Sequence, residues 1–426
     1  MMFSLDIFEL VLFLVEYAPY VVSVLAALWF LIPSHASRRR ALVIGILPLS
    51  VVVMIVSTFL FSWGDAYAKG YKVFELPSLR AKLETYIEDG VDNLHEILET
   101  DTYAPTFGFY EMRYLFTDLL RHTVFHLDTH NEENIDEGYN KGNDWFHSTL
   151  GDTMMYTCGI FPTGTETLEE AQNYKIDYVA DALQLEPGHS VLDIGCGWSY
   201  LTKRLTEKHG ANVTAITLSK EQHKWGTKLN ENNSATILLQ DAMKIRERTD
   251  LPVDGFDRIT SLEMAEHVGI RRYQEFLSIV HGLLKDDGVF YFQVAGLRRA
   301  WSFEDLVWGL FMGEHVFPGA DASCPLGWVS SQVERAGFEI QRVHNMGSHY
   351  SRTLAKWLEN WRGNKDYIVG KYGDVAYRRW EVFLAWSVRV ARQGSSTLFM
   401  LTLTKAGVQD ERRIATQDHM AKTMVN

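Results

Sequence analysis

The stretch VLDIGCGWSYL, from Val191 to Leu201, combines residue types that can bind a nucleotide-like cofactor. Asp193 ends an apolar run, Gly195 and Gly197 follow it, and an amphipathic segment begins directly afterwards. A glycine turn between a strand and a helix lets the backbone approach a ligand and points the helix N-terminus at it. The sequence therefore predicts a cofactor-binding loop here, with a simple pair of turn glycines as the alternative.

The loop lacks two features of a dinucleotide site. Ser199 stands where a third glycine is expected, and the next apolar run ends in TLSKEQ, with Thr217, Leu218 and Ser219 where an acid would hold the ribose. These differences disfavour NAD. An acid–x–Gly–x–Gly loop resembles instead the S-adenosylmethionine site of class I methyltransferases. That resemblance implies that Asp193 holds the amino acid part of the cofactor and Asp241 its adenine, although Asp241 reads equally well as a helix cap.

The elements that must position this loop follow from the hydrophobic pattern. From residue 189 to residue 404, short apolar runs alternate with amphipathic segments, which predicts an α/β fold with a doubly wound, mainly parallel sheet. Residues 66–150 are polar with apolar residues at helical spacing, which predicts helices. The seven expected strands are SVLDIG, NVTAITL, ATILLQD, FDRITSLEM, GVFYFQV, FEIQRVHNM and STLFMLTLT.

Composition limits the partners. The chain has 426 residues, 46% of them hydrophobic, and a net charge of -13, which disfavours nucleic acid as a partner. Three widely spaced cysteines predict reduced thiols, not a disulfide framework. His122, His126 and His130 would share one helix face, but no zinc-hydrolase pattern accompanies them, so no metal site is predicted.

Two long apolar segments, about 10–32 and 41–63, precede the helical region. Each is long enough to cross a hydrocarbon core of about 30 Å, which predicts a membrane hairpin. A signal peptide is the alternative for the first segment, and the acidic start of the chain disfavours it. Arg38, Arg39 and Arg40 would place the connecting loop in the cytosol and the large domain on the opposite side of the membrane. A cytosolic cofactor requires the reverse, so we expect the hairpin to lie shallowly or to depart from this charge rule.

Five motifs make the resemblance specific. MMYTCGIF, VLDIGCGW, TLSKEQ, EMAEHVG and GSHYSRTL occur in the order and spacing of the cyclopropane fatty acid synthase family, over roughly residues 140 to 405. Within that family, EMAEHVGIRRY, VAGLRRAWSFEDLVWGLFM and VFPGADAS look like the sphingolipid C9-methyltransferases. The resemblance implies methyl transfer from S-adenosylmethionine to C9 of the Δ8-unsaturated sphingoid base of a ceramide or glucosylceramide. The resulting carbocation would lose a proton to give a branched alkene.

The resemblance also implies which residues hold the cofactor. Gln222 would take the place of the missing ribose-binding acid. Ser199 departs from the glycine usual in the family, and we expect a local adjustment there without loss of binding. The residues expected to bind the cofactor are Tyr156, Thr157, Asp193, Gly195, Gly197, Thr217, Leu218, Gln222 and Asp241.

The same resemblance implies a bicarbonate ion as the base, held by the backbone near Cys158, by Glu266, by a histidine on the fifth strand and by Tyr350. Gln293 stands at the histidine position, and a neutral amide can bond an anion but cannot donate charge to it. Bicarbonate therefore stays open, and we expect Glu266 to be either its ligand or the base itself. The alternatives are a structural acid for Glu266, a half-buried tyrosine for Tyr350 and a small packed side chain for Cys158.

The expected domains are a membrane hairpin in 1–65, a helical linker and substrate-side cap in 66–150, a methyltransferase domain in 151–405 and a polar tail in 406–426. The aromatic-rich insertion at about 297–330 predicts a lid or acyl groove, with a core or dimer helix as the alternative. Taken with the family, these features predict a multi-pass membrane protein of the endoplasmic reticulum with a cytosolic catalytic domain, and a possible homodimer.

Three other functions remain open at this stage. A cyclopropane synthase would act on unsaturated phospholipid acyl chains. A small-amine N-methyltransferase shares the scaffold, and the apolar hairpin disfavours it. A non-catalytic lipid-binding or scaffold protein would use the fold without turnover.

Overall fold

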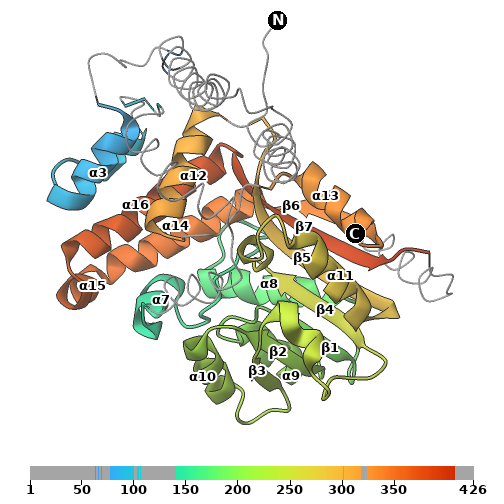
Figure 1. The fold of residues 1–426 in the computed structure, drawn as a ribbon. Coiled ribbons are helices and arrows are strands. Elements are labelled where there is room, and N and C mark those ends of the chain that lie inside the picture. Colours follow the sequence, from blue (N-terminus) through green and yellow to red (C-terminus); the bar gives the residue numbers. More distant parts are fainter. Residues whose placement is uncertain are drawn as a thin grey trace, which may run out of the picture. The chain divides into compact units, whose positions relative to one another are not determined.

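The computed structural model describes residues 77–99, 141–300, 302–317 and 324–407, with the single positions 63, 66, 69, 103, 104 and 106. Figure 1 labels the helices and strands. The chain divides into two compact units. The first comprises residues 1–126 and 299–315, and the second comprises residues 127–298 and 316–426.

The second unit is built on a seven-stranded sheet of order β3-β2-β1-β4-β5-β7-β6. β7 runs antiparallel to both of its neighbours, and the other strand pairs are parallel. This confirms the predicted α/β class and all seven predicted strands. They are β1 Ser190–Ile194, β2 Asn212–Thr217, β3 Thr236–Leu239, β4 Phe256–Leu262, β5 Leu284–Leu297, β6 Phe338–Asn345 and β7 Ser396–Lys405.

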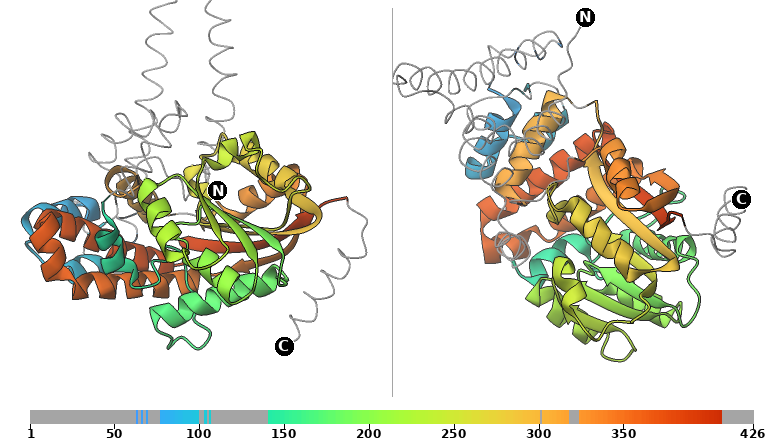
Figure 2. Two further views of the ribbon diagram at one scale, coloured as in Figure 1. Left: turned by 90° about the horizontal axis from the view of Figure 1, so that it is seen from below. Right: turned by 45° about the vertical axis from the view of Figure 1, so that its right-hand side comes forward.

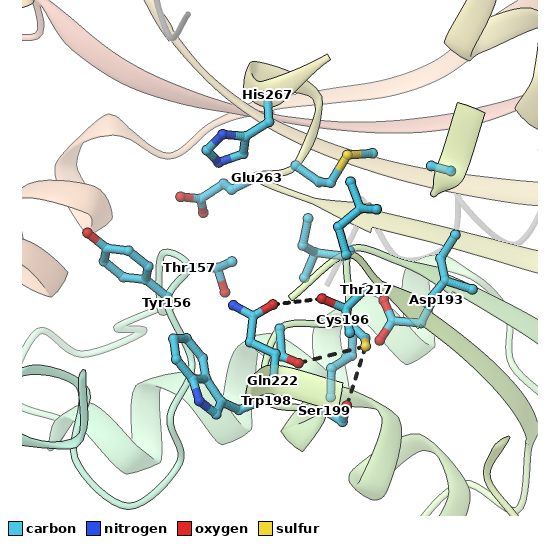
Figure 3. Close-up of a pocket in the computed structure, with 18 of the residues that line it drawn as sticks. Tyr156, Thr157, Asp193, Cys196, Trp198, Ser199, Thr217, Gln222, Glu263 and His267 are labelled. Atoms are coloured by element: carbon cyan, nitrogen blue, oxygen red, sulfur yellow. Dashed lines mark hydrogen bonds between the residues drawn. The ribbon is translucent and has the colours of Figure 1, made fainter. Parts of the chain in front are cut away.

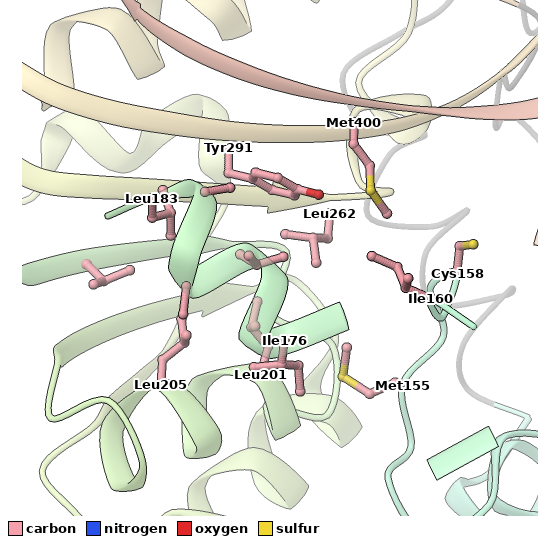
Figure 4. Packing of buried hydrophobic residues seen from close by; sticks show 14 of the residues in the cluster. Met155, Cys158, Ile160, Ile176, Leu183, Leu201, Leu205, Leu262, Tyr291 and Met400 are labelled. Carbon is pink, nitrogen blue, oxygen red and sulfur yellow. The ribbon is translucent and has the colours of Figure 1, made fainter. Parts of the chain in front are cut away.

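Helices cover both faces of this sheet, which is why its central strands read as continuous apolar runs. One face carries α8 (Leu168–Ala182), α9 (Tyr200–Glu207) and α10 (Lys220–Leu229), and the other carries α11 (Tyr273–Leu283) and α13 (Leu326–Arg335), as Figure 2 shows. The core between α8, α9 and the sheet is drawn in Figure 4. Its labelled members include Ile176, Leu183, Leu201, Leu205, Leu262, Tyr291 and Met400.

An aromatic cluster joins the remaining helices of the second unit. These helices are α7 (Asn143–Leu150), α14 (Gly347–Gly363), α15 (Lys365–Tyr372) and α16 (Asp374–Arg392), and η2 (Ala242–Glu247) and η3 (Ala265–His267) are short 3-10 turns. The ring centroids of Trp145 and Trp361 lie 4.7 Å apart, and Trp361 stacks on Tyr377 at 5.6 Å. Buried aromatic pairs of this kind add to the stability that area burial gives.

The first unit contains α3 (Leu79–Asp89), α4 (Leu94–Glu99) and α12 (Phe303–His315). Ion pairs join α3 to α12: the buried guanidinium of Arg80 contacts Glu84 and Glu314, and His315 lies 2.9 Å from Glu84. α12 falls in the predicted insertion, whose role as a lid stays a prediction.

The structure corrects the predicted localisation. No helix in the described ranges is long and apolar enough to cross a membrane, so the prediction of a multi-pass membrane protein of the endoplasmic reticulum is wrong for that part of the chain. The two apolar segments on which it depended lie outside the described residues, apart from position 63. His122, His126 and His130 also lie outside them.

Candidate active site

A pocket lies at the carboxyl ends of β1, β2 and β4 (Figure 3). The strand order reverses between β1 and β4, and ligands of open α/β sheets bind outside the carboxyl ends of strands at such a point. All nine residues expected to bind the cofactor line this pocket: Tyr156, Thr157, Asp193, Gly195, Gly197, Thr217, Leu218, Gln222 and Asp241.

The glycine loop leaves β1 with its backbone in the left-handed region. Gly195 has φ +79° and Gly197 has φ +55°. A Cβ on Gly195 would lie 2.4 Å from Cγ of Met264, so only glycine allows the loop to approach the turn after β4. A Cβ on Gly197 would meet nothing within 4 Å, which leaves its backbone open to the pocket.

Ser199 adopts the backbone conformation of the glycine that it replaces, with φ +64°. Its side chain is completely buried against Gly226 of α10, where a Cβ would lie 2.3 Å from Oγ of Ser199. The local adjustment expected at Ser199 is therefore a cavity for its hydroxymethyl group, provided by a helix glycine that lacks a Cβ.

Asp193 connects the loop to its neighbours. Its carboxylate accepts hydrogen bonds from Oγ1 of Thr202 at 2.9 Å and from Oγ1 of Thr260 at 3.0 Å. Burial raises the pKa of this carboxyl to about 6. The two bonds fix α9 and β4 against the end of β1, and a direct contact with the cofactor stays a prediction.

Gln222 and Asp241 lie on the other side of the pocket. Gln222 Oε1 accepts a hydrogen bond from Oγ1 of Thr217 at 2.8 Å, which orients its amide. Asp241 Oδ1 accepts one from the backbone N–H of Met243 at 2.8 Å and caps η2. Asp241 therefore caps a helical turn and also lines the pocket, and its contact with the adenine stays a prediction.

Aromatic side chains form an apolar wall. The Tyr156 ring lies 5.1 Å from that of Trp357, and the Trp198 ring lies 4.8 Å from that of Phe146. Trp198 Nε1 donates a hydrogen bond to Asn143 at 2.7 Å, so its polar atom is satisfied. Such a wall keeps water away from a reactive intermediate.

Two of the four predicted base-holding groups, the Cys158 backbone and the Gln293 amide, converge on Glu263, a carboxylate that the sequence did not single out. The backbone N–H of Cys158 donates to Oε1 of Glu263 at 2.8 Å, and Nε2 of Gln293 donates to the same oxygen at 2.6 Å. Glu263 follows β4 directly and lines the pocket. The motif EMAEHVG carries two acids, Glu263 and Glu266, and the position of Glu263 directly after an expected strand is the one signal that could have indicated it.

Glu266 and Tyr350 do not line the pocket. Glu266 is buried, and its Oε1 accepts a hydrogen bond from the backbone N–H of Ala295. Tyr350, at the start of α14, packs against the core, and burial raises its pKa well above the usual range. Burial also raises the pKa of the Cys158 thiol, as expected for a packed side chain and not a nucleophile.

Two further titratable side chains, those of Lys175 and His267, lie in or beside the pocket. Lys175 of α8 is buried, and its Nζ donates to Oγ1 of Thr157 at 2.6 Å. Burial lowers the lysine pKa, while the negative charge of Glu263 acts to raise it. His267 lines the pocket, and burial lowers its pKa to about 4, so the imidazole is neutral at pH 7.

A sheet of this order with a glycine-loop pocket at its carboxyl edge is the fold of class I S-adenosylmethionine-dependent methyltransferases. Residues 126–401 match the family described as mycolic acid cyclopropane synthetase, and the chain belongs to that family.

Curated relatives and solved structures agree with this placement. Sphingolipid C9-methyltransferase 2 of Gibberella zeae is 42% identical over 333 residues, which cover 76% of this chain and 63% of that protein. Sphingolipid C9-methyltransferase of Candida albicans is 39% identical over 373 residues, which cover 81% of this chain and 72% of that protein. The crystal structure of mycolic acid cyclopropane synthase CmaA1 with SAH and CTAB has a TM-score of 0.60 at 30% identity, covering 64% of this chain and 98% of that one.

Proposed function

We propose that this chain transfers a methyl group from S-adenosylmethionine to C9 of the Δ8-unsaturated sphingoid base of a ceramide or glucosylceramide. The observation that carries the proposal is the pocket, which gathers nine cofactor-type residues around the glycine loop and has a carboxylate, Glu263, in its wall. Relatives named sphingolipid C9-methyltransferase, at 42% and 39% identity, support the substrate class.

The residues present fit the cofactor. The backbone at Gly197 is open to the pocket, and the Gln222 amide is already oriented by Thr217. Gly195, Gly197 and Asp193 would hold the amino acid part, Gln222 the ribose and Asp241 the adenine. The bound cofactor would supply an electrophilic methyl group on a sulfonium.

The protein's own tasks are to exclude water and to accept a proton. Methylation of an alkene carbon leaves a cation on the neighbouring carbon, which water would trap. Tyr156 and Trp198 form an apolar wall beside the loop, and a carboxylate in the same pocket would take a proton from the lipid chain.

The product of a reaction with trideuteriomethyl cofactor tests this proposal. The purified full-length chain in detergent micelles would be incubated with this cofactor and either a Δ8-unsaturated ceramide or a phospholipid with monounsaturated acyl chains. Loss of a chain proton keeps all three deuterium atoms in a branched alkene. Cyclopropane formation removes one deuteron from the new methyl group.

We expect methylated ceramide with all deuterium retained. Deuterium-depleted cyclopropane in the phospholipid would favour the cyclopropane synthase. Binding of S-adenosylhomocysteine without product from either lipid would contradict both assignments and favour another acceptor or a non-catalytic role.

A further inference from the structure

Glu263 has a backbone conformation that is unusual for its residue type. Its φ is +51°, in the left-handed region that residues other than Gly, Asn and Asp rarely adopt. Strain of this kind persists only where the surroundings fix it, and it gathers at functional sites. Here the backbone N–H of Glu263 donates to the carbonyl oxygen of Gln293 at 2.8 Å, so the turn is tied to β5.

The side chain of Glu263 is held as firmly as its backbone. Oε1 accepts from both Cys158 N–H and Gln293 Nε2. Within the part of the chain that the structure describes, Oε2 makes no hydrogen bond, so this oxygen remains to accept a proton. Figure 3 shows the carboxylate pointing into the pocket toward the side of Tyr156 and Thr157.

These contacts do not fit a bicarbonate ion. The resemblance to the cyclopropane fatty acid synthase family implies that the backbone near Cys158 and the residue at position 293 hold that ion. In this structure both of these groups donate to Glu263 instead. A bicarbonate ion there would displace the carboxylate and then lie beside its negative charge, without a histidine to balance it.

The surroundings also make Glu263 a suitable base. Burial raises the pKa of its carboxyl, while the Cys158 and Gln293 hydrogen bonds and the charge of Lys175 act to lower it. A carboxylate with a raised pKa accepts a proton more readily than one in water. The two hydrogen bonds and the charge of Lys175 thus offset part of the effect of burial and favour the carboxylate form.

We propose that the Glu263 carboxylate is the built-in base of this chain and occupies the place of a bicarbonate ion. This inference rests on the proposed methyl transfer. After the methyl–sulfur bond breaks and the methyl–C9 bond forms, a C–H bond next to the cationic carbon breaks. Its electron pair forms the new C=C bond, and the proton goes to Oε2 of Glu263. The neutral acid then returns the proton to water.

Three variants test the base. Glu263→Gln keeps the size and both accepted hydrogen bonds at Oε1 but removes the charge. Glu263→Gly suits the positive φ and opens a space between Cys158 N–H and Gln293 Nε2. Glu266→Gln is the comparison variant, because the family resemblance assigned the role to Glu266 and this residue does not line the pocket.

We expect Glu263→Gln to lower kcat about 10²- to 10⁴-fold, the usual contribution of a positioned base, with S-adenosylhomocysteine affinity within about twofold of wild type. Wild-type turnover should be unchanged in CO₂-depleted buffer. Added bicarbonate should partly restore Glu263→Gly and leave Glu263→Gln unchanged. Full activity in Glu263→Gln, or loss of wild-type activity on CO₂ depletion, would overturn the inference.

A binding measurement separates this inference from the proposed substrate. Carbon-13 NMR with labelled bicarbonate would be recorded on the S-adenosylhomocysteine complexes, without lipid. Glu263→Gly should bind the ion and the wild type should not. Bicarbonate bound to the wild type would overturn the inference, whereas absence of ceramide methylation would overturn only the proposed substrate.

Discussion

The side chain of Ser199 occupies the space that a Cβ on Gly226 would need: such a Cβ would lie 2.3 Å from Oγ and 3.0 Å from Cβ of Ser199. The first residue belongs to the cofactor loop and the second to α10. The course of the loop at position 199 thus depends on a helix residue without a side chain.

The effect of Gly226→Ala on the unfolding free energy should therefore have opposite signs in the wild type and in the Ser199→Gly variant. In the wild type the new methyl group meets Ser199, and the overpacking should cost about 1–3 kcal/mol of unfolding free energy. In Ser199→Gly the next atom is Cγ2 of Ile237 at 3.5 Å, an ordinary contact. There, the same change should stabilise by up to about 1 kcal/mol, because alanine favours a helix over glycine. Urea unfolding of the singles and the double variant measures this, and equal effects in both backgrounds would contradict it.

Gln222→Ala should weaken S-adenosylhomocysteine binding about 3- to 10-fold, the cost of one hydrogen bond of ordinary strength. Isothermal titration calorimetry gives the affinity. Lys220→Ala is the control, since Lys220 is exposed on the same helix and does not line the pocket. Unchanged affinity in Gln222→Ala, or equal weakening in Lys220→Ala, would refute the ribose contact.

Asp193 should make stability fall as pH rises. Burial raises its folded pKa to about 6 from the ordinary 3.8, so the folded state binds the proton more tightly than the unfolded state. The contribution is complete below about pH 4 and is lost as pH rises through about 6. The unfolding free energy of the wild type relative to Asp193→Asn should thus drop by about 1–2 kcal/mol from pH 5 to pH 7. Chemical denaturation at both pH values measures it, and a pH-independent difference would exclude a raised pKa.

Lys175→Met should shift the acid limb of the pH–rate profile to higher pH. The charge of Lys175 acts to lower the pKa of Glu263, so removing it favours the protonated acid, and the carboxylate forms only at higher pH. We expect a shift of about 0.5–1 pH unit in kcat/KM. Lys203→Met on α9 should leave the limb in place. An unshifted limb in Lys175→Met would show that Lys175 does not act on the base.

The sequence predicted most of the scaffold because buried parallel strands leave continuous apolar runs. SVLDIG and NVTAITL became β1 and β2, and the glycine loop followed β1 as expected. The antiparallel course of β7 was not predicted, since strand direction leaves no mark in an apolar run such as STLFMLTLT.

The sequence did not indicate which glutamate of EMAEHVG lines the pocket, for a specific reason. Glu263 and Glu266 both lie in EMAEHVG, and the motif resemblance favoured Glu266. The positive φ of Glu263 sends its side chain into the pocket, and η3 turns Glu266 toward the backbone of Ala295. A left-handed glutamate is too rare for any local pattern to indicate it.

The place of β7 in the sheet has a consequence for how the chain folds during synthesis. Among the strands that the structure describes, β6 pairs only with β7, and β7 leaves the ribosome after β6 and the intervening helices α14, α15 and α16. Until then β6 has no strand to pair with, and β5 presents an open edge to other chains. A nascent chain paused between residues 345 and 396 would therefore carry a finished cofactor loop on an unfinished sheet, and would be the form most in need of a chaperone.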